Sequence, residues 1–248
     1  MNDTENSLNN INIPKKTIPF LLPLRCVLFL AAFLIISFIS QLPYSSISKW
    51  WTTIAIVCNF ITIAILYLFA RKKGLNYRKL LNYEKGKTKA GIAILIIVLT
   101  VIVGMCGLYL AGLICYGAFP YLDKTMVEPI PLWLAIIVLL LLPLSTTLAE
   151  DGLYLGYAVN TATTNKWVNV SLAAFFYALQ HSFIPFLPDG IFILYRFLSF
   201  LPLTVLICLW YNKNRNPLPF MIGHFILNIA TAVQILIMTV CPDLFNAL

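Results

Sequence analysis

Charged residues are scarce in this chain: 10% of its 248 residues are charged, whereas 60% are hydrophobic. A soluble globular domain carries about a quarter charged residues, so this composition excludes water as the main solvent of the protein. A single compact membrane domain accounts for the length, because a membrane-spanning helix uses about 20 mostly apolar residues and short loops use the rest. A second domain is not needed.

Paired cysteines are also missing. The six cysteines stand singly in apolar stretches, without a CxxC pair or metal-site spacing: Cys26, Cys58, Cys106, Cys115, Cys208 and Cys241. Such residues behave as small buried apolar side chains. The formal net charge is +8, but the basic residues lie between hydrophobic runs and do not form one exposed face. Nucleic acid is therefore not an expected partner.

The beginning of the chain lacks the charged and then apolar pattern of a cleavable signal. Its first residues, MNDTENSLNNINIPKK, are polar and rich in asparagine. We predict that residues 1–19 form a disordered tail and that the first hydrophobic helix stays as an anchor. Residues 20–248 are then expected to form a single transmembrane domain.

Seven hydrophobic runs are each long enough to cross a hydrocarbon layer about 30 Å thick. They lie at about 20–42, 51–70, 90–118, 131–160, 168–187, 191–211 and 219–241. The run 131–160 is interrupted by Pro143 and Gly152, so it is either one kinked helix or a short pair. The expected fold is all-α, a polytopic integral membrane helical bundle of about 7–8 transmembrane helices.

The positions of the basic residues predict the orientation in the membrane. The segment 71–89 contains many basic residues against the single acid Glu84: Arg71, Lys72, Lys73, Arg78, Lys79, Lys85, Lys87 and Lys89. Such a segment is typical of a cytoplasmic loop. Further basic residues precede the first helix or fall in loops on the same side: Lys15, Lys16, Arg25, Lys166, Lys213 and Arg215. We therefore expect a cytoplasmic amino terminus and location in a cell membrane.

Few ionisable side chains lie inside the hydrophobic runs. They include the acids Glu150 and Asp151 and the two histidines of the chain, His181 and His224. Placing an acid or a base at membrane depth costs at least about 2.5 to 3.5 kcal/mol on insertion scales, so these residues need a reason to be there. Asn228 is four residues after His224, on the same face of a helix.

These residue types can hydrolyse a peptide bond. A carboxylate and a histidine can activate a water molecule, and a second histidine with an amide N–H can stabilise the oxyanion that forms on the attacked carbonyl. The alternative for each single residue is a purely structural role, as a polar contact that holds two helices together. Four polar groups within one apolar half of the chain favour the hydrolase.

The order of these residues resembles the intramembrane CAAX prenyl-endopeptidase family, also called CPBP or Abi proteins, with motifs EExxxR, FxxxH and HxxxN/B. The matching residues are Glu150-Asp151, Tyr177-Ala-Leu-Gln-His181 and His224-x-x-x-Asn228, within a family-like core of about 130–241. The resemblance implies a helical bundle with a cavity facing the cytosol. It also implies that Glu150 is the general base, that His181 is its partner and that His224 with Asn228 forms the oxyanion site, without a metal or other cofactor.

Three positions depart from the family pattern. Asp151 stands where the motif has its second glutamate, Tyr177 where it has phenylalanine, and Leu155 where it has arginine. The last change removes the cation four residues after Asp151, which is the spacing of a helical ion pair. Arg196, the only cation inside the run 191–211, is the candidate replacement.

The main functional prediction is an intramembrane endopeptidase. It would cleave a membrane-associated peptide or a lipidated protein, and membrane lipid would be a further partner. A catalytically impaired scaffold or a bacteriocin-immunity protein is the alternative, because the motif arginine is missing. A third interpretation makes Glu150, His181 and His224 zinc ligands. A transporter is disfavoured because the polar groups cluster in the second half without a matching repeat.

Overall fold

The computed structural model describes residues 20–83, 88–121, 123–160 and 165–247. Within these ranges the chain forms helices, turns and loops and no β-strand. The predicted disordered tail, residues 1–19, lies outside the described residues, and so do Lys15, Lys16, Lys85 and Lys87. An all-α fold is confirmed.

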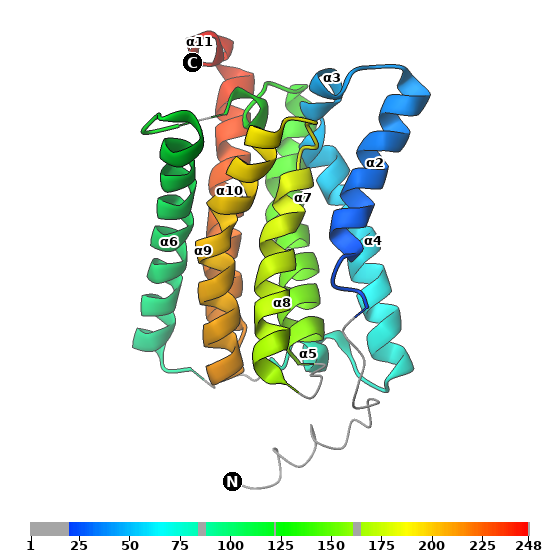
Figure 1. The fold of residues 1–248 in the computed structure, drawn as a ribbon, viewed down its shortest axis with the longest axis vertical. Helices are drawn as coiled ribbons and strands as arrows, with labels where there is room; N and C mark the ends of the chain where they lie inside the picture. Colours follow the sequence, from blue (N-terminus) through cyan, green and yellow to red (C-terminus); the bar gives the residue numbers. More distant parts are fainter. Residues whose placement is uncertain (1–19, 84–87, 122, 161–164, 248) are drawn as a thin grey trace, which may run out of the picture.

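Each of the seven predicted hydrophobic runs contains a helix, and these helices lie roughly side by side (Figure 1). Their bounds are α2 Leu24–Ser40, α4 Trp51–Lys72, α6 Ala90–Tyr116, α7 Leu132–Asp151, α8 Lys166–Leu179, α9 Gly190–Asn214 and α10 Leu218–Val240. Shorter elements are α3 Tyr44–Ser48, α5 Tyr77–Leu80, η1 Lys124–Met126, η3 Gln180–Phe183 and α11 Pro242–Asn246.

Five of these helices are long and apolar enough to cross a membrane: α4, α6, α7 with its continuation, α9 and α10. The shorter α2 is also apolar, with 17 residues. The protein is therefore a polytopic membrane bundle, and the expected count of 7–8 spans is approximate.

The run 131–160 forms one continuous helical segment. Pro143 lies inside α7, and the π-helix η2, Gly152–Val159, follows directly after Asp151. A π-helix is rare and often marks a functional site, because its wider turn displaces the side chains that follow. Here the change of helix type comes immediately after the two acids.

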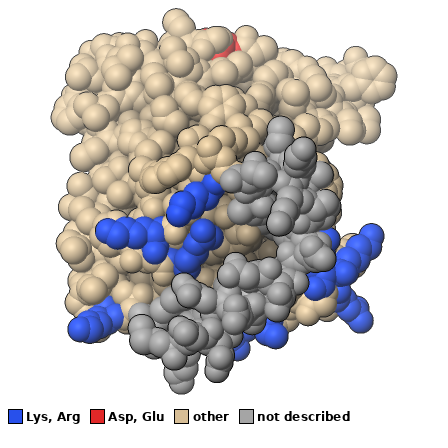
Figure 2. Space-filling view, turned by 60° about the horizontal axis from the view of Figure 1, so that its bottom comes forward, with Lys and Arg blue, Asp and Glu red and all other residues tan. Residues whose placement is uncertain are grey.

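Charge separates the two ends of the bundle. Figure 2 shows Lys and Arg gathered toward the end from which α6 and α8 begin. Most of the described basic residues belong to this end: Arg71, Lys72, Lys73, Arg78, Lys79, Lys89, Lys166, Lys213 and Arg215. The opposite end carries Lys49 and Lys124 together with the described acids Asp123, Glu128, Asp189 and Asp243. We call the first of these the basic end.

Small residues let the helices approach closely where the bundle holds its polar side chains. A Cβ added to Gly107 of α6 would collide with the carbonyl oxygen of Ser199 on α9, and one added to Gly223 of α10 would lie 2.7 Å from Cβ of Thr100 on α6. Small residues are typical of helix contacts in membranes, where packing drives association. Gly223 therefore fixes the position of the next residue, His224.

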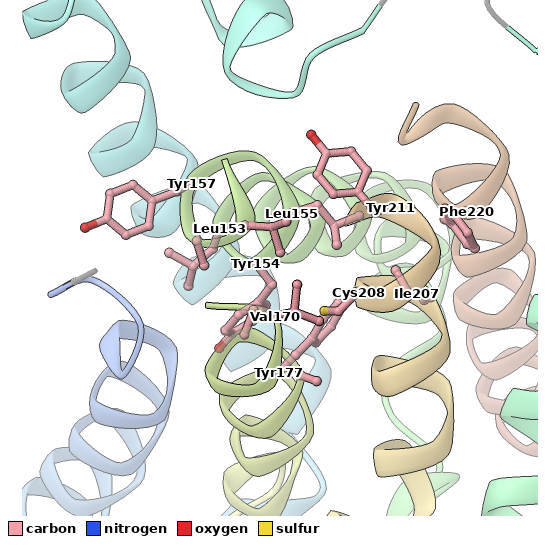
Figure 3. Close-up of a cluster of buried hydrophobic side chains, with 14 of the residues drawn as sticks. Leu153, Tyr154, Leu155, Tyr157, Val170, Tyr177, Ile207, Cys208, Tyr211 and Phe220 are labelled. Carbon is pink, nitrogen blue, oxygen red and sulfur yellow. The ribbon is translucent and has the colours of Figure 1, made fainter. Parts of the chain in front are cut away.

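An apolar cluster surrounds η2. Figure 3 shows ten of its labelled members: Leu153, Tyr154, Leu155, Tyr157, Val170, Tyr177, Ile207, Cys208, Tyr211 and Phe220. They come from η2, α8, α9 and α10. Toward the basic end, α5 packs against η2, since a Cβ on Gly156 would lie 3.1 Å from the Leu80 carbonyl oxygen. The labelled members therefore join η2 to α8, α9 and α10 next to the two acids of α7.

Candidate active site

Glu150 lies at the end of α7 with a side chain that is almost entirely buried. Its Oε2 is 3.8 Å from Nε2 of His181 and 3.5 Å from Nε2 of His224. This oxygen is buried and has no hydrogen-bond partner among the described residues. The structure therefore brings the first acid and both histidines, from three helical segments, to one point.

His181 is held at both of its ring faces and by one ring nitrogen. Its Nδ1 is 2.9 Å from the Tyr177 carbonyl oxygen, one turn earlier, and its ring stacks on Phe200 with centroids 3.5 Å apart. A carbonyl oxygen only accepts, so Nδ1 carries the hydrogen and Nε2 of the neutral ring has a lone pair. Nε2 of His181 and Oε2 of Glu150 are then two acceptors that face each other, and a water molecule can donate a hydrogen to each.

The second acid organises His224. The Tyr177 hydroxyl donates to Oδ1 of Asp151 at 2.9 Å, and Nδ1 of His224 lies 3.1 Å from the same hydroxyl oxygen and 3.5 Å from Oδ2 of Asp151. Since the hydroxyl hydrogen is used by Asp151, Nδ1 of His224 is the donor in this group. The imidazole therefore lies between the two carboxylates, with Nδ1 toward Asp151 and Nε2 toward Glu150.

Asn228 shares a helix face with His224 but is less closely involved. Its side-chain amide donates to the His224 carbonyl oxygen at 3.1 Å, and it is partly exposed. Within the described residues it makes no hydrogen bond to Glu150, His181 or Asp151. Of the four predicted catalytic residues, the structure joins Glu150, His181 and His224 directly and holds Asn228 one turn away.

Arg196 does not replace the motif arginine, so the predicted pairing with Asp151 is wrong. Its Nη2 donates to the Ile184 carbonyl oxygen at 2.9 Å, its Nε donates to that of His181 at 3.4 Å, and its guanidinium lies over the Phe200 ring. The physical reason is the irregular connection between η3 and α9, where the carbonyl oxygens of His181 and Ile184 are placed to accept from the buried guanidinium. Arg196 thus supports the His181 segment and not Asp151.

Leu155, at the position of the motif arginine, belongs to the apolar cluster and is 0% exposed. No cation on η2 therefore accompanies Asp151. Its partners come from other helices, namely Tyr177 of α8 and His224 of α10. Figure 3 shows Tyr177 beside Tyr154 of η2, on which its ring stacks with centroids 4.5 Å apart.

Three polar residues of the site were not identified from the sequence: Arg25, Asn59 and Gln180. Arg25 Nη2 forms an ion pair with Oε1 of Glu150 at 2.9 Å. Arg25 was predicted to precede the first helix, but it lies in the first turn of α2 with 1% exposure. The reason is that α2 begins part-way along the bundle (Figure 1), so its first turn is at the level of the site. The available signal was an arginine just inside the run 20–42.

The site holds no group of three His, Cys, Asp or Glu side chains arranged to bind a metal ion, within the part of the chain that the structure describes. The three side chains considered as zinc ligands do converge, but the carboxylate among them is bound to a guanidinium through its other oxygen. The other oxygen, Oε2, keeps lone pairs that can accept a hydrogen bond from water.

A bundle of apolar helices around a buried carboxylate and two imidazoles defines an integral membrane protein with a buried polar centre. Residues 131–230 match the family of type II CAAX prenyl endopeptidase Rce1-like proteins, so this segment of the chain is an Rce1-like domain. The resemblance inferred from the motifs is confirmed. No curated protein and no solved structure matches the chain.

Proposed function

We propose that this protein is a CAAX-type intramembrane endopeptidase in which Glu150 and His181 activate water for attack on a peptide bond. The observation that carries the proposal is Oε2 of Glu150, which is buried, has no hydrogen-bond partner among the described residues and faces Nε2 of both His181 and His224. The Rce1-like family of residues 131–230 supports a protease of this class.

In the proposed reaction, a water molecule donates hydrogen bonds to Oε2 of Glu150 and Nε2 of His181. Glu150 takes a proton as the water oxygen forms a bond to the carbonyl carbon of the substrate. The same proton then goes to the amide nitrogen as the C–N bond breaks, and the second hydrogen of the water stays on the new C–OH group, which yields a carboxylic acid and an amine. A tightly held general base contributes about 10²- to 10⁴-fold to such a reaction.

His224 and Asn228 are assigned to the developing oxyanion. The Asp151 carboxylate on the Nδ1 side of His224 can stabilise a positive charge on the imidazole, so that Nε2–H donates toward the substrate oxygen. The Asn228 amide would turn from the His224 carbonyl oxygen to the same oxyanion. Tyr177, which donates to Asp151, keeps that carboxylate oriented.

The substrate would be a membrane-delivered peptide or a lipidated protein, cleaved in a cell membrane with membrane lipid around the bundle. We propose that the basic end faces the cytoplasm, because loops rich in Lys and Arg stay on that side. The amino terminus would then be cytoplasmic as well. A cysteine-accessibility experiment with probes added from either side of sealed vesicles tests this orientation.

The central test uses purified protein in detergent or in vesicles with a panel of lipidated and unmodified peptide reporters. We expect Glu150→Gln, which keeps the size and removes the base, to lower kcat by about 100-fold or more. Thr204→Val is the matched control, since Thr204 is a buried polar residue that bonds the Ala174 carbonyl oxygen away from the site. Turnover by Glu150→Gln close to that of wild type would reject the mechanism.

The proposed reaction uses no metal. The ion pair of Glu150 with Arg25 supports this, since a guanidinium already balances the carboxylate charge that a metal ion would balance. Activity should survive treatment with a strong chelator, and loss of activity that zinc restores would favour the zinc interpretation. Wild-type protein that cleaves no reporter, with a biological effect that Glu150→Gln retains, would favour the non-catalytic scaffold.

A further inference from the structure

We propose that Arg25 is the positioning residue of Glu150: from the first turn of α2 it binds Oε1 and so turns Oε2 toward the two imidazoles. This inference rests on the proposed function, because it concerns the orientation of the proposed general base. It assigns to α2 a part in a site whose acids and histidines all lie in the Rce1-like segment, residues 131–230.

The guanidinium of Arg25 is fixed by partners on three other elements. Nη2 donates to Oε1 of Glu150 at 2.9 Å, and Nη1 donates to Oδ1 of Asn59 on α4 at 2.7 Å. Nε donates to Oε1 of Gln180 on η3, and the guanidinium lies over the ring of Phe29, 5.1 Å from its centroid. A planar group with five N–H donors in a rigid fork has one orientation that satisfies all of these partners.

Asn59 ties this network back to α7, the helix of Glu150. Its Nδ2 donates to Oγ of Ser145 at 3.1 Å and to Oγ1 of Thr146 at 2.9 Å. Both hydroxyl groups lie about one turn before Glu150. Because Nδ2 is used in this way, Oδ1 is the atom that faces Arg25. Arg25 therefore reaches α7 by two routes, directly through Glu150 and indirectly through Asn59.

Gln180 ties the same network to the first histidine. Its Oε1 accepts from Arg25 and lies 3.3 Å from the Tyr154 hydroxyl, which donates to it. Gln180 is fully buried and directly precedes His181. One guanidinium thus sets the position of the carboxylate and is bonded to the residue beside its histidine partner.

The pairing is one-sided, and this asymmetry is what a general base requires. Arg25 occupies Oε1, whereas Oε2 keeps its lone pairs toward His181 and His224. Of the described Lys and Arg side chains, Arg25 alone lies within ion-pair distance of Glu150. Arg196 is bonded to carbonyl oxygens and Leu155 is apolar, so neither can take over this function.

The test compares Arg25→Gln and Arg25→Lys with wild type on a cleaved reporter, with Phe33→Leu as the control. Phe33 is a fully buried residue of α2 that packs in a different cluster. We expect Arg25→Gln to lower kcat about 10- to 100-fold with KM nearly unchanged, because a misplaced catalytic group costs rate and not substrate binding. Arg25→Lys should give an intermediate kcat, since an ammonium restores the charge but not the fork.

A purely structural role for Arg25 predicts a different result, namely equal losses of folded protein for Arg25→Gln and Phe33→Leu with kcat per folded molecule unchanged. A kcat for Arg25→Gln within about threefold of wild type, or a rise in KM alone, overturns the inference. If Arg25→Gln does not fold, Asn59→Ala decides: a lower kcat supports the inference and an unchanged kcat overturns it. Activity retained by Glu150→Gln would instead overturn the proposed function itself.

Discussion

Two successive stretches of one helical segment have opposite characters. The end of α7 presents Glu150 and Asp151 to polar partners from α2, α8, η3 and α10, whereas η2 presents Leu153, Tyr154 and Leu155 to an apolar cluster. Both stretches are buried. The difference is that the acids are held by ion pairs and hydrogen bonds, which have direction, and η2 is held mainly by packing, which does not, with a hydrogen bond from the Tyr154 hydroxyl to Gln180.

The two stretches of this segment therefore have different expected functions, the first in the reaction and the second in stability. Charges at membrane depth are costly and are retained where they serve a reaction, while close packing of η2 with α8 and α9 keeps the helices that carry them in register. Changes in the first stretch should therefore alter turnover, and changes in the second should alter stability. Three substitutions test whether activity and stability separate in this way.

The largest effect is expected for His181→Ala, which removes the imidazole that faces Oε2 of Glu150. Turnover of a cleaved peptide reporter should fall about 10²- to 10⁴-fold, the usual contribution of general acid–base catalysis. The control is Phe200→Leu, which removes the ring that stacks on His181 and faces the Arg196 guanidinium but keeps the imidazole, and it should cost much less activity. Equal losses in the two variants would mean that ring packing, and not the imidazole, limits turnover.

A smaller but clear effect on stability is expected for Leu155→Ala. Removing a fully buried leucine from the apolar cluster should lower the free energy of unfolding by about 2 to 5 kcal/mol, because a cavity remains. Thermal unfolding in detergent measures the loss. The kcat of the folded fraction should remain close to that of wild type, and a loss of activity without a loss of stability would break the proposed separation.

The smallest effect is expected for Tyr177→Phe. Tyr177 lies on α8 and contacts both stretches, Asp151 at the end of α7 and Tyr154 on η2. The ring stays in the apolar cluster (Figure 3), while the hydroxyl that donates to Asp151 and contacts His224 is lost. Loss of a hydrogen bond to a charged group costs at least about 1.5 kcal/mol, so we expect a decrease in kcat of about tenfold and a small drop in unfolding temperature. A 100-fold decrease would make Tyr177 a catalytic residue.

The sequence alone identified the class of the fold and much of the site. Continuous apolar runs can only be buried in lipid or in one another, so the seven helical runs were visible without coordinates. The scarcity of ionisable residues inside those runs selected Glu150, His181 and His224, because such residues are expensive at membrane depth. The structure brings these three together.

Only the tertiary structure decided which cation accompanies the acids. Spacing along a helix predicts a partner on the same helix, where Leu155 stands, and the sequence offered Arg196 instead as the only cation inside the run 191–211. Arg25 is far from Glu150 in sequence and reaches it because α2 begins part-way along the bundle. Where a helix begins relative to its neighbours follows from the packing of the whole bundle, and no local pattern of residues encodes it.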